Sequence, residues 1–231
     1  MDRPDPGSRP DPVDFIRANM NLVAIPSLPE IRLYTPHPAS GLGRLVDPRD
    51  ADDDTQTEDG IEPRPPYWAY AWAGGTVLSR YILDYPQTVA GRRVLDLGAG
   101  SGLVGIAAAR AGARTVIAAE IDPNGVAAIG LNAAANGVGI TIVDKDITVD
   151  PPPAVDLVLA GDVFYDPDVA RRMMPFLDRC LAAGIEVLVG DPRRSDLPLP
   201  RLRLLAEYQV PDFGHAKGLP SGVFSFAQED C

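Results

Sequence analysis

The chain has 231 residues, a length that fits one α/β domain with extensions better than two complete domains. Hydrophobic residues make up 45% of it and are spread along its length, which argues against global disorder. No run of about 18 or more apolar residues occurs, so we expect no membrane partner. The formal net charge of −11 argues against nucleic acid as a partner, since phosphate binding needs clustered Lys and Arg. An acidic surface suits a small molecule or a basic region of a protein.

The N-terminal quarter of the chain differs in composition from the rest. Residues 1–12 are rich in Pro and charge and predict a disordered tail without the apolar stretch of a secretory signal, so a cytoplasmic location is expected. Residues 13–61 are expected to form an N-terminal extension. It has an apolar opening, helical and then extended, between Phe15 and Tyr34, and an acidic loop from Asp47 to Gly60. Residues 62–231 are left for the main domain.

Cysteine and histidine are too few for a framework of disulfides or metal sites. The cysteines are Cys180 and Cys231, and the histidines, His37 and His215, are isolated. With no cluster of His, Cys and Asp at ligand spacing, we expect no metal.

The main domain alternates short apolar runs with helical segments from residue 92 onward, which is typical of a parallel sheet with crossover helices. The expected strands are Arg93–Leu97, Thr115–Glu120, Ile140–Asp144, Asp156–Ala160, Glu186–Gly190, Leu202–Val210 and Gly222–Ala227. The expected helices are Thr76–Tyr85, Gly102–Ala111, Pro123–Asn136 and Pro167–Leu181. No helix separates the last two strands, which predicts an antiparallel hairpin. The fold class is therefore α/β: a Rossmann-like, seven-stranded, mostly parallel sheet with helices on both faces and an antiparallel C-terminal hairpin.

A glycine-rich turn follows the first strand of this domain, in the segment VLDLGAGSG. Gly98, Gly100 and Gly102 allow a sharp turn and let a ligand approach the amides at the helix N-terminus. Residues 100–105 also satisfy the dinucleotide pattern G-x-G-x-x-G, so a nicotinamide or flavin enzyme must be considered. Counted from the strand end, however, the third glycine of that pattern would fall on Leu103. The register therefore disfavours a dinucleotide.

Three carboxylates follow or end neighbouring strands. Asp96 precedes the first glycine, where it can attract the ammonium and sulfonium of S-adenosylmethionine and would repel a pyrophosphate. Glu120 can accept both hydroxyls of a ribose, a feature that nicotinamide enzymes share. Asp146 is placed to meet the adenine amino group, although a loop Asp is as often a solvated turn residue. Together they predict S-adenosylmethionine, with S-adenosylhomocysteine as the product.

Several motifs resemble those of a known family. Asp96, Gly98, Gly100, Gly102 and Glu120 resemble motif I and the next acidic strand end of the class I methyltransferases. The segments WAxxWxGG (68–75), GDVFYD (161–166) and GDP (190–192) resemble those of the seven-β-strand protein lysine methyltransferases, and among these the electron-transfer flavoprotein β-subunit lysine methyltransferases and their bacterial relatives. The likeness covers about residues 62–230.

The resemblance implies a set of site residues. The expected cofactor-binding residues are Trp72, Asp96, Gly98, Gly100, Gly102, Glu120, Ile121, Asp146 and Gly161. Asp162 and Tyr165 are expected to border the acceptor lysine and to act in catalysis. We expect Phe164 and Trp68 in the substrate channel, where aromatic rings attract a cation, although aromatic side chains more often pack in a core. Trp68 and Trp72 share one face if their segment is helical. The motifs assign no contact to Arg193 and Arg194, which follow GDP.

A role for Asp162 also follows from its position after the fourth strand, since open α/β sheets bind ligands beyond the carboxyl ends of their strands. A lysine amine, whose usual pKa is about 10.4, must lose its proton before it attacks a methyl group. Our hypothesis is that Asp162 orients the amine and offsets its charge while the proton leaves to water. The alternative is a local role in which Asp162 caps the following turn.

The function that we expect is S-adenosylmethionine-dependent protein-lysine N-methylation, with the electron-transfer flavoprotein β subunit as the protein partner. Three alternatives stay open at this point. One is an N-methyltransferase of a small amine or of another protein, such as a ribosomal one, because the turn specifies the cofactor better than the acceptor. Another is a catalytically silent partner protein that binds S-adenosylmethionine. The last is a nicotinamide oxidoreductase, which Leu103 disfavours.

Overall fold

The structure, a computed structural model, describes residues 10–45, 56–57, 60–61, 66–212 and 218–227. The tail predicted at 1–12 and the acidic loop predicted at 47–60 lie largely outside these residues. Helix α1 (Pro12–Asn19) begins at the last residue of the predicted tail, and the Asp11 carboxylate caps it by accepting the Asp14 N–H at 3.0 Å. Within and beside the loop, β3 (Gln56–Thr57) and β4 (Gly60–Ile61) form a short antiparallel pair.

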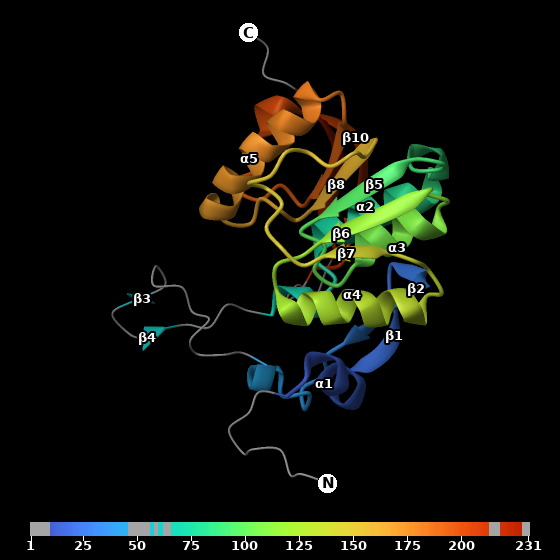
Figure 1. The fold of residues 1–231 in the computed structure, drawn as a ribbon, viewed down its shortest axis with the longest axis vertical. Helices are drawn as coiled ribbons and strands as arrows, with labels where there is room; N and C mark the ends of the chain where they lie inside the picture. The colour runs from blue at the N-terminus through green and yellow to red at the C-terminus, as the bar shows by residue number, and fades with distance from the viewer. Residues whose placement is uncertain (1–9, 46–55, 58–59, 62–65, 213–217, 228–231) are drawn as a thin grey trace.

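A seven-stranded sheet forms the centre of the molecule, in the order β10-β11-β9-β8-β5-β6-β7 (Figure 1). Its strands are β5 (Arg93–Leu97), β6 (Thr115–Ala119), β7 (Thr141–Val143), β8 (Leu157–Gly161), β9 (Glu186–Asp191), β10 (Leu202–Val210) and β11 (Leu219–Phe226). Strands β5 to β9 are parallel, and β11 pairs antiparallel with both β9 and β10. The predicted fold class is therefore confirmed.

Helices cover both faces of the sheet, so the central strands β5, β8 and β9 are buried along almost their whole length. The longer helices are α2 (Ala73–Asp84), α3 (Leu103–Arg110), α4 (Pro123–Ala135) and α5 (Pro167–Ala182). Short 3-10 turns occur at η1 (Leu42–Leu45), η4 (Tyr67–Ala69), η5 (Pro86–Thr88) and η6 (Leu199–Arg201). Val94 and Leu157 pack with α2 and α3, whereas Leu95 and Val158 pack with α5 on the other face (Figure 1). None of the described helices is long and apolar enough to cross a membrane.

The ends of these elements follow local signals in the sequence. An Asp–Pro pair begins α4: the Asp122 carboxylate caps the helix by accepting the Asn124 N–H at 2.8 Å, and Pro123 takes the first helical position. Strand β7 is shorter than the predicted Ile140–Asp144, since it lies at the sheet edge and pairs only with β6. Helix α2 begins at Ala73, three residues before the predicted start.

The N-terminal extension contains a hairpin where the sequence predicted one extended piece. Strands β1 (Asn21–Ile25) and β2 (Leu28–Thr35) pair antiparallel. The buried apolar residues of this hairpin pack with α3, and β2 also lies against α4. Asn132 of α4 and Asn136, the C-cap of that helix, hold β2. Asn132 Oδ1 accepts the Tyr34 N–H at 2.8 Å, and Asn136 Oδ1 accepts the Arg32 N–H at 3.0 Å. Asn132 Nδ2 also donates to the Ser101 carbonyl at 2.8 Å, so the extension is joined to the glycine turn.

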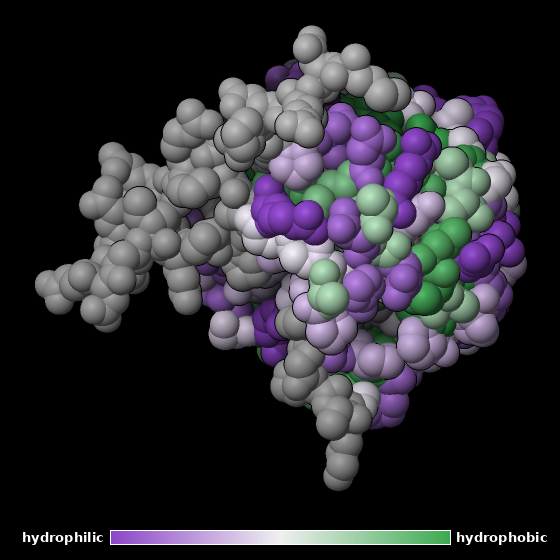
Figure 2. Space-filling view, turned by 90° about the horizontal axis from the view of Figure 1, so that it is seen from below, coloured by the Kyte–Doolittle hydropathy of each residue, from purple (hydrophilic) through white to green (hydrophobic). Residues whose placement is uncertain are grey.

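The surface of this end of the molecule is mixed in character. Figure 2, the view from below, shows mostly hydrophilic residues with hydrophobic ones between them. Val23 of β1 is one of the exposed apolar residues, with 41% of its surface accessible.

Candidate active site

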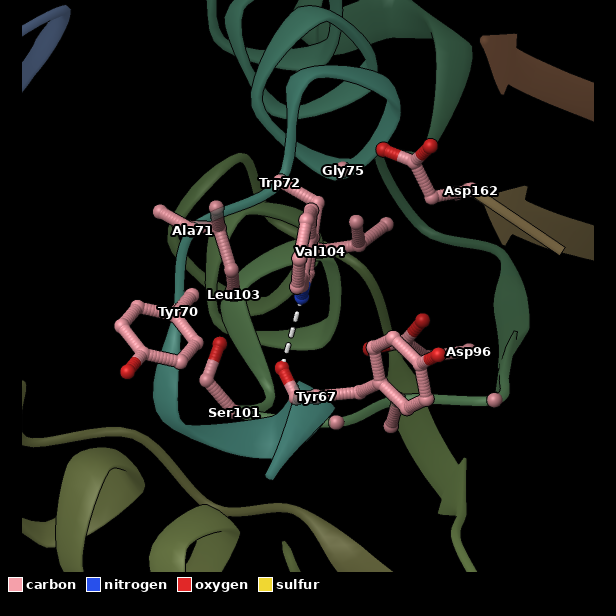
Figure 3. A pocket seen from close by; sticks show the side chains of 14 residues that line it. Tyr67, Tyr70, Ala71, Trp72, Gly75, Asp96, Ser101, Leu103, Val104 and Asp162 are labelled. Carbon is pink, nitrogen blue, oxygen red and sulfur yellow. Dashed lines mark hydrogen bonds between the residues drawn. The ribbon is translucent and has the colours of Figure 1, made fainter. Parts of the chain in front are cut away.

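A pocket lies at the carboxyl ends of β5 and β8, between the glycine turn and the start of α2 (Figure 3). The predicted site residues that line it are Trp72, Asp96, Gly98, Gly100, Gly161 and Asp162. Tyr67, Tyr70 and Ser101 also line it, and the sequence had not marked them. The fold therefore brings most of the predicted cofactor-binding residues to one place, as the carboxyl ends of parallel strands require.

The turn after β5 needs its glycines for backbone reasons. Gly98, Gly100 and Gly102 have φ of 66°, 54° and 80°, in the left-handed region that residues with a side chain rarely adopt. Gly102 caps the N-terminus of α3, and a Cβ there would lie 3.3 Å from the Ile129 side chain. The turn is therefore a backbone structure that presents amides to the pocket.

Asp96 is the buried carboxylate of the cofactor side. Only 1% of its surface is accessible, and its Oδ2 accepts the Gly105 N–H at 2.7 Å. Burial raises the pKa of Asp96 to about 7, and the nearby charge of Glu120 acts in the same direction. A cation bound in the pocket would favour the ionised form of Asp96, since opposite charges attract strongly where water is excluded.

Glu120 holds the turn together. Its Oε2 accepts the Gly100 N–H at 2.7 Å, and its Oε1 accepts the N–H groups of Ile121 and Asp122 at 2.7 and 2.9 Å. Burial raises the pKa of Glu120, and these three hydrogen bonds oppose the rise. Its contact with a ribose remains a prediction.

Four predicted cofactor residues lie outside the pocket lining: Gly102, Glu120, Ile121 and Asp146. Ile121 follows Glu120 and is 57% exposed, although it is large and apolar. Asp146 caps its own turn after β7: its Oδ1 accepts the N–H and the hydroxyl of Thr148 at 2.8 and 2.6 Å. Asp146 is therefore a turn residue, as the alternative interpretation had it. The cofactor contacts of Ile121 and Asp146 remain predictions.

The two aromatics expected in the substrate channel are core residues, so that prediction is wrong. Phe164 is fully buried and packs with Phe176 and Leu177 of α5, because α5 follows directly and covers that side of the sheet. Trp68 is 3% exposed and packs with Ile16 of α1 beside α4. Both side chains therefore pack in the core, and neither borders an opening toward solvent.

Trp68 and Trp72 also do not share a helical face, because η4 ends at Ala69 and α2 begins only at Ala73. Trp72 instead lines the pocket, and its Nε1 donates to the Tyr67 carbonyl at 2.7 Å (Figure 3).

Exposed aromatic rings form the rim of the pocket. The ring centre of Tyr67 lies 5.7 Å from that of Trp72 and 4.9 Å from that of Tyr165. Tyr67 is 38% exposed and Tyr165 40% exposed. Tyr165 therefore borders the pocket through Tyr67 rather than lining it. Tyr67 was not predicted from the sequence, because no spacing rule distinguishes this rim residue from its buried neighbour Trp68.

Asp162 lies at the opposite wall from the glycine turn, and the backbone there is unusual: φ is 56°. The side chain is buried, and instead of capping the following turn it binds two distant groups. Its Oδ2 accepts the Gly74 N–H at the start of α2, and its Oδ1 accepts from Arg194 Nε at 2.5 Å. Burial raises the pKa of Asp162, while the positive charge and hydrogen bond of Arg194 oppose the rise.

Glycines let the motif segments approach one another closely. A Cβ on Gly74 would lie 2.2 Å from the Gly190 carbonyl oxygen, and a Cβ on Gly190 would lie 2.2 Å from the Gly74 oxygen. A Cβ on Gly161 would lie 2.8 Å from the Cα of Gly75. The first turn of α2 thus packs directly on the ends of β8 and β9, and this contact positions Asp162.

The residues of the pocket fit S-adenosylmethionine. A cofactor with an ammonium and a sulfonium needs negative charge and aromatic rings, and the pocket supplies Asp96, Asp162, Tyr67 and Trp72 together with the amides of the turn. Among the described residues, no group of three His, Cys, Asp or Glu could hold a metal ion.

Comparison with known proteins agrees with the fold. Residues 74–163 match the family model of the ribosomal protein L11 methyltransferase (PrmA). The fold is that of TrmN from Thermus thermophilus, with a TM-score of 0.51 at 24% identity, over 66% of this chain and 48% of that chain. The strand order, the glycine turn and the match to this family model are those of the class I methyltransferases, whose cofactor is S-adenosylmethionine.

Two relatives place the chain more narrowly. The electron transfer flavoprotein beta subunit lysine methyltransferase of Danio rerio is 36% identical over 215 residues, which are 89% of this chain and 78% of that protein. The Rattus norvegicus protein of the same name is 42% identical over 64% of this chain, and the chain spans only 60% of its length. The chain belongs to the electron transfer flavoprotein beta subunit lysine methyltransferase family. Its likeness also extends beyond the residues 62–230 that the motifs indicated, since the Danio match covers 89% of the chain.

Proposed function

We propose that this chain transfers a methyl group from S-adenosylmethionine to a lysine of the electron-transfer flavoprotein β subunit. One observation of the structure supports it above the others: the buried carboxylate of Asp162 shares a pocket with the glycine turn after β5. An acidic wall opposite a cofactor turn suits an acceptor that arrives as a cation. The relatives of this chain carry the β subunit in their names, which supports it as the acceptor.

The side chains of the pocket have distinct tasks in this proposal. Asp96 and the amides of the turn bind the amino-acid end of the cofactor, whose sulfonium supplies the methyl group. The rings of Tyr67 and Tyr165 at the rim enclose the lysine stem and attract its charge. These groups hold the amine in line with the methyl carbon, and such positioning provides most of the rate when the leaving group is already good.

Asp162 acts on the amine itself. A lysine amine reaches the pocket protonated, since its usual pKa is about 10.4. The carboxylate accepts a hydrogen bond from the ammonium and keeps the nitrogen directed at the methyl group while one proton leaves to water. Because Asp162 is buried, this interaction is stronger than it would be at the surface.

The test is methyl transfer from labelled S-adenosylmethionine to the purified β subunit, with mass spectrometry of the modified lysine. We expect Asp162→Asn to lower kcat by about a hundredfold, as loss of an oriented charged group at a reacting centre commonly does. Asn tolerates the left-handed backbone of this position, so the fold is preserved. Binding of S-adenosylhomocysteine, measured by calorimetry, should change little.

Asp166→Asn is the matched control. Asp166 lies four residues further on and caps α5 by accepting the N–H groups of Asp168 and Val169 at 2.8 and 3.2 Å. Asn caps helices as well as Asp does, so this variant should keep full activity. Full activity of Asp162→Asn would contradict the proposed role. A chain that binds S-adenosylhomocysteine but methylates nothing would be the silent partner protein considered above.

Ribosomal protein L11 is the second candidate acceptor, because residues 74–163 match the L11 methyltransferase model. This range includes the cofactor turn and ends just after Asp162, so it omits the Tyr165 part of the rim. The match therefore supports the identity of the cofactor more than the identity of the acceptor. Equal amounts of L11 and of the β subunit in one labelling reaction decide between them, and preferential labelling of L11 would overturn our assignment. Labelling of free lysine instead of either protein would indicate a small-amine acceptor.

A further inference from the structure

Arg194 is the centre of a buried group of charges that joins four segments of the chain. Its Nε donates to Asp162 Oδ1 at 2.5 Å, and its Nη2 lies 3.6 Å from Asp212 Oδ2. Its backbone N–H donates to Asp191 Oδ1 at 2.7 Å. The guanidinium carbon lies 5.9 Å from the centre of the Trp72 ring, within the range of a cation–π contact. One side chain thus touches both the acceptor wall and the cofactor wall of the pocket.

The group carries more negative than positive charge. Asp162, Asp191 and Asp212 are 8%, 0% and 8% exposed, and the Arg194 side chain is the cation that faces them. Asp191 Oδ2 is buried without a hydrogen-bond partner. Two of the carboxylates bind the first turn of α2: Asp162 accepts the Gly74 N–H, and Asp212 accepts the Ala73 N–H at 3.1 Å. The excess negative charge of this group favours the binding of a second cation beside Arg194.

We propose that Arg194 is a positioning residue that holds Asp162 against the pocket wall in the absence of an acceptor, and that it pairs with Asp212 instead when the acceptor ammonium binds Asp162. The inference rests on the proposed lysine methylation and deepens it. Both partners of the exchange are already in place, since the guanidinium lies between the two carboxylates. The movement is short because Asp212 is only 3.6 Å away.

This role explains why an arginine suits the position. A guanidinium has five donors in a planar fork and can bind two carboxylates at once, while its flat face lies over Trp72. The positive charge of Arg194 also favours the ionised form of Asp162: burial raises the pKa of that carboxyl, and Arg194 opposes the rise. The described groups that face Asp162 are Asp191 at the end of β9, Arg194 after β9, Asp212 after β10, and Asp96 across the pocket. Of these, only Arg194 is a cation.

The experiment compares Arg194→Gln and Arg194→Lys with the unchanged chain in methyl transfer to the β subunit, between about pH 6.5 and pH 9. Arg194→Gln removes the charge, so we expect kcat to fall by about ten- to a hundredfold near pH 7. The deficit should shrink as the pH rises and Asp162 ionises without its partner. Arg194→Lys keeps the charge and should restore the pH profile of the unchanged chain, with an intermediate kcat because one ammonium cannot bridge both carboxylates.

Arg193→Gln is the matched control. Arg193 is adjacent in sequence but pairs with Glu207 at 2.5 Å on the surface, outside the group. This variant should keep the kcat and the pH profile of the unchanged chain. In all three variants the affinity for S-adenosylhomocysteine should stay within about twofold, because none of the three removes a predicted cofactor contact.

Three results would overturn the inference: an unchanged kcat in Arg194→Gln, a deficit that is equal at every pH, or equal losses of activity and melting temperature in the Gln and Lys variants. The last result would mean that Arg194 only stabilises the fold. Failure of the unchanged chain to methylate the β subunit would be a failure of the proposed function instead. The same variant ratios would then be measured on whichever lysate protein the chain labels, and a chain that labels none would overturn both.

Discussion

The close approach of Gly74 and Gly190 leads to a sharp prediction for the variant Gly74→Ala. The new Cβ would lie 2.2 Å from the Gly190 carbonyl oxygen and 2.7 Å from the Asp162 nitrogen. Both neighbours are backbone atoms of the sheet region, so they cannot turn aside as a flexible side chain would. Overpacking of a well-packed site costs about 1–3 kcal/mol, and this contact lies at the upper end because the backbone itself must shift. A loss of about 3 kcal/mol lowers the melting temperature of a chain of this size by roughly 6–12 °C.

The next residue of the same helix is the matched control. A Cβ on Gly75 would meet only the Val104 Cγ2 at 3.7 Å, an ordinary van der Waals contact. Alanine restricts the unfolded chain more than glycine does, so Gly75→Ala should be neutral or stabilising by up to about 1 kcal/mol. Thermal unfolding followed by circular dichroism measures both variants. A melting temperature of Gly74→Ala equal to that of the unchanged chain, or an equal fall in Gly75→Ala, would refute the argument from close packing.

Two further predictions concern the pocket. Burial raises the pKa of Asp96 to about 7, so its charged form, which binds the cofactor ammonium, is present above that pH. The affinity for S-adenosylhomocysteine should be constant above about pH 7 and weaken by up to about tenfold per pH unit below it. In calorimetry, Asp96→Asn should bind more weakly and without this pH dependence. The same pH dependence in the variant would contradict the assignment. Loss of the Tyr67 ring in Tyr67→Ala should raise the KM for the acceptor by about two- to tenfold, whereas Tyr67→Phe keeps the ring and should keep the KM. Steady-state kinetics measure both variants. An equal KM in the two would exclude a role of the Tyr67 ring in acceptor binding.

Local signals in the sequence predicted the central elements well. Strand β5 (Arg93–Leu97) begins and ends where the sequence indicated, because an apolar run ends at a glycine that leaves the strand. The start of α4 was equally clear, since Asp122 and Pro123 specify a cap and a first helical position. The N-terminal hairpin was harder to predict, because its strands bury their apolar residues against α3 rather than within a larger sheet. Their pattern therefore lacks a regular alternation of polar and apolar residues.

The sequence predicts those parts of the site whose residues are close together in the chain, and it misses those that depend on distant contacts. Asp96 and the glycines lie within nine residues of one another, so a linear motif describes their geometry. Arg194 binds a carboxylate 32 positions away, and no short pattern expresses such a pair. Phe164 was misplaced because a motif gives the identity of an aromatic residue but not the side of the sheet to which it points. That direction depends on α5, which covers the ring completely.

The attachment of the N-terminal hairpin to α4 has a consequence for folding during synthesis. The bonds from Tyr34 to Asn132 and from Arg32 to Asn136 join residues 98 and 104 positions apart. At a synthesis rate of about 5–20 residues per second, the hairpin leaves the ribosome roughly 5–20 seconds before its partner helix exists. During that interval the amides of Arg32 and Tyr34 lack their asparagine partners. The hairpin is thus an early segment that folds late, and a nascent chain arrested before α4 would be an aggregation-prone intermediate.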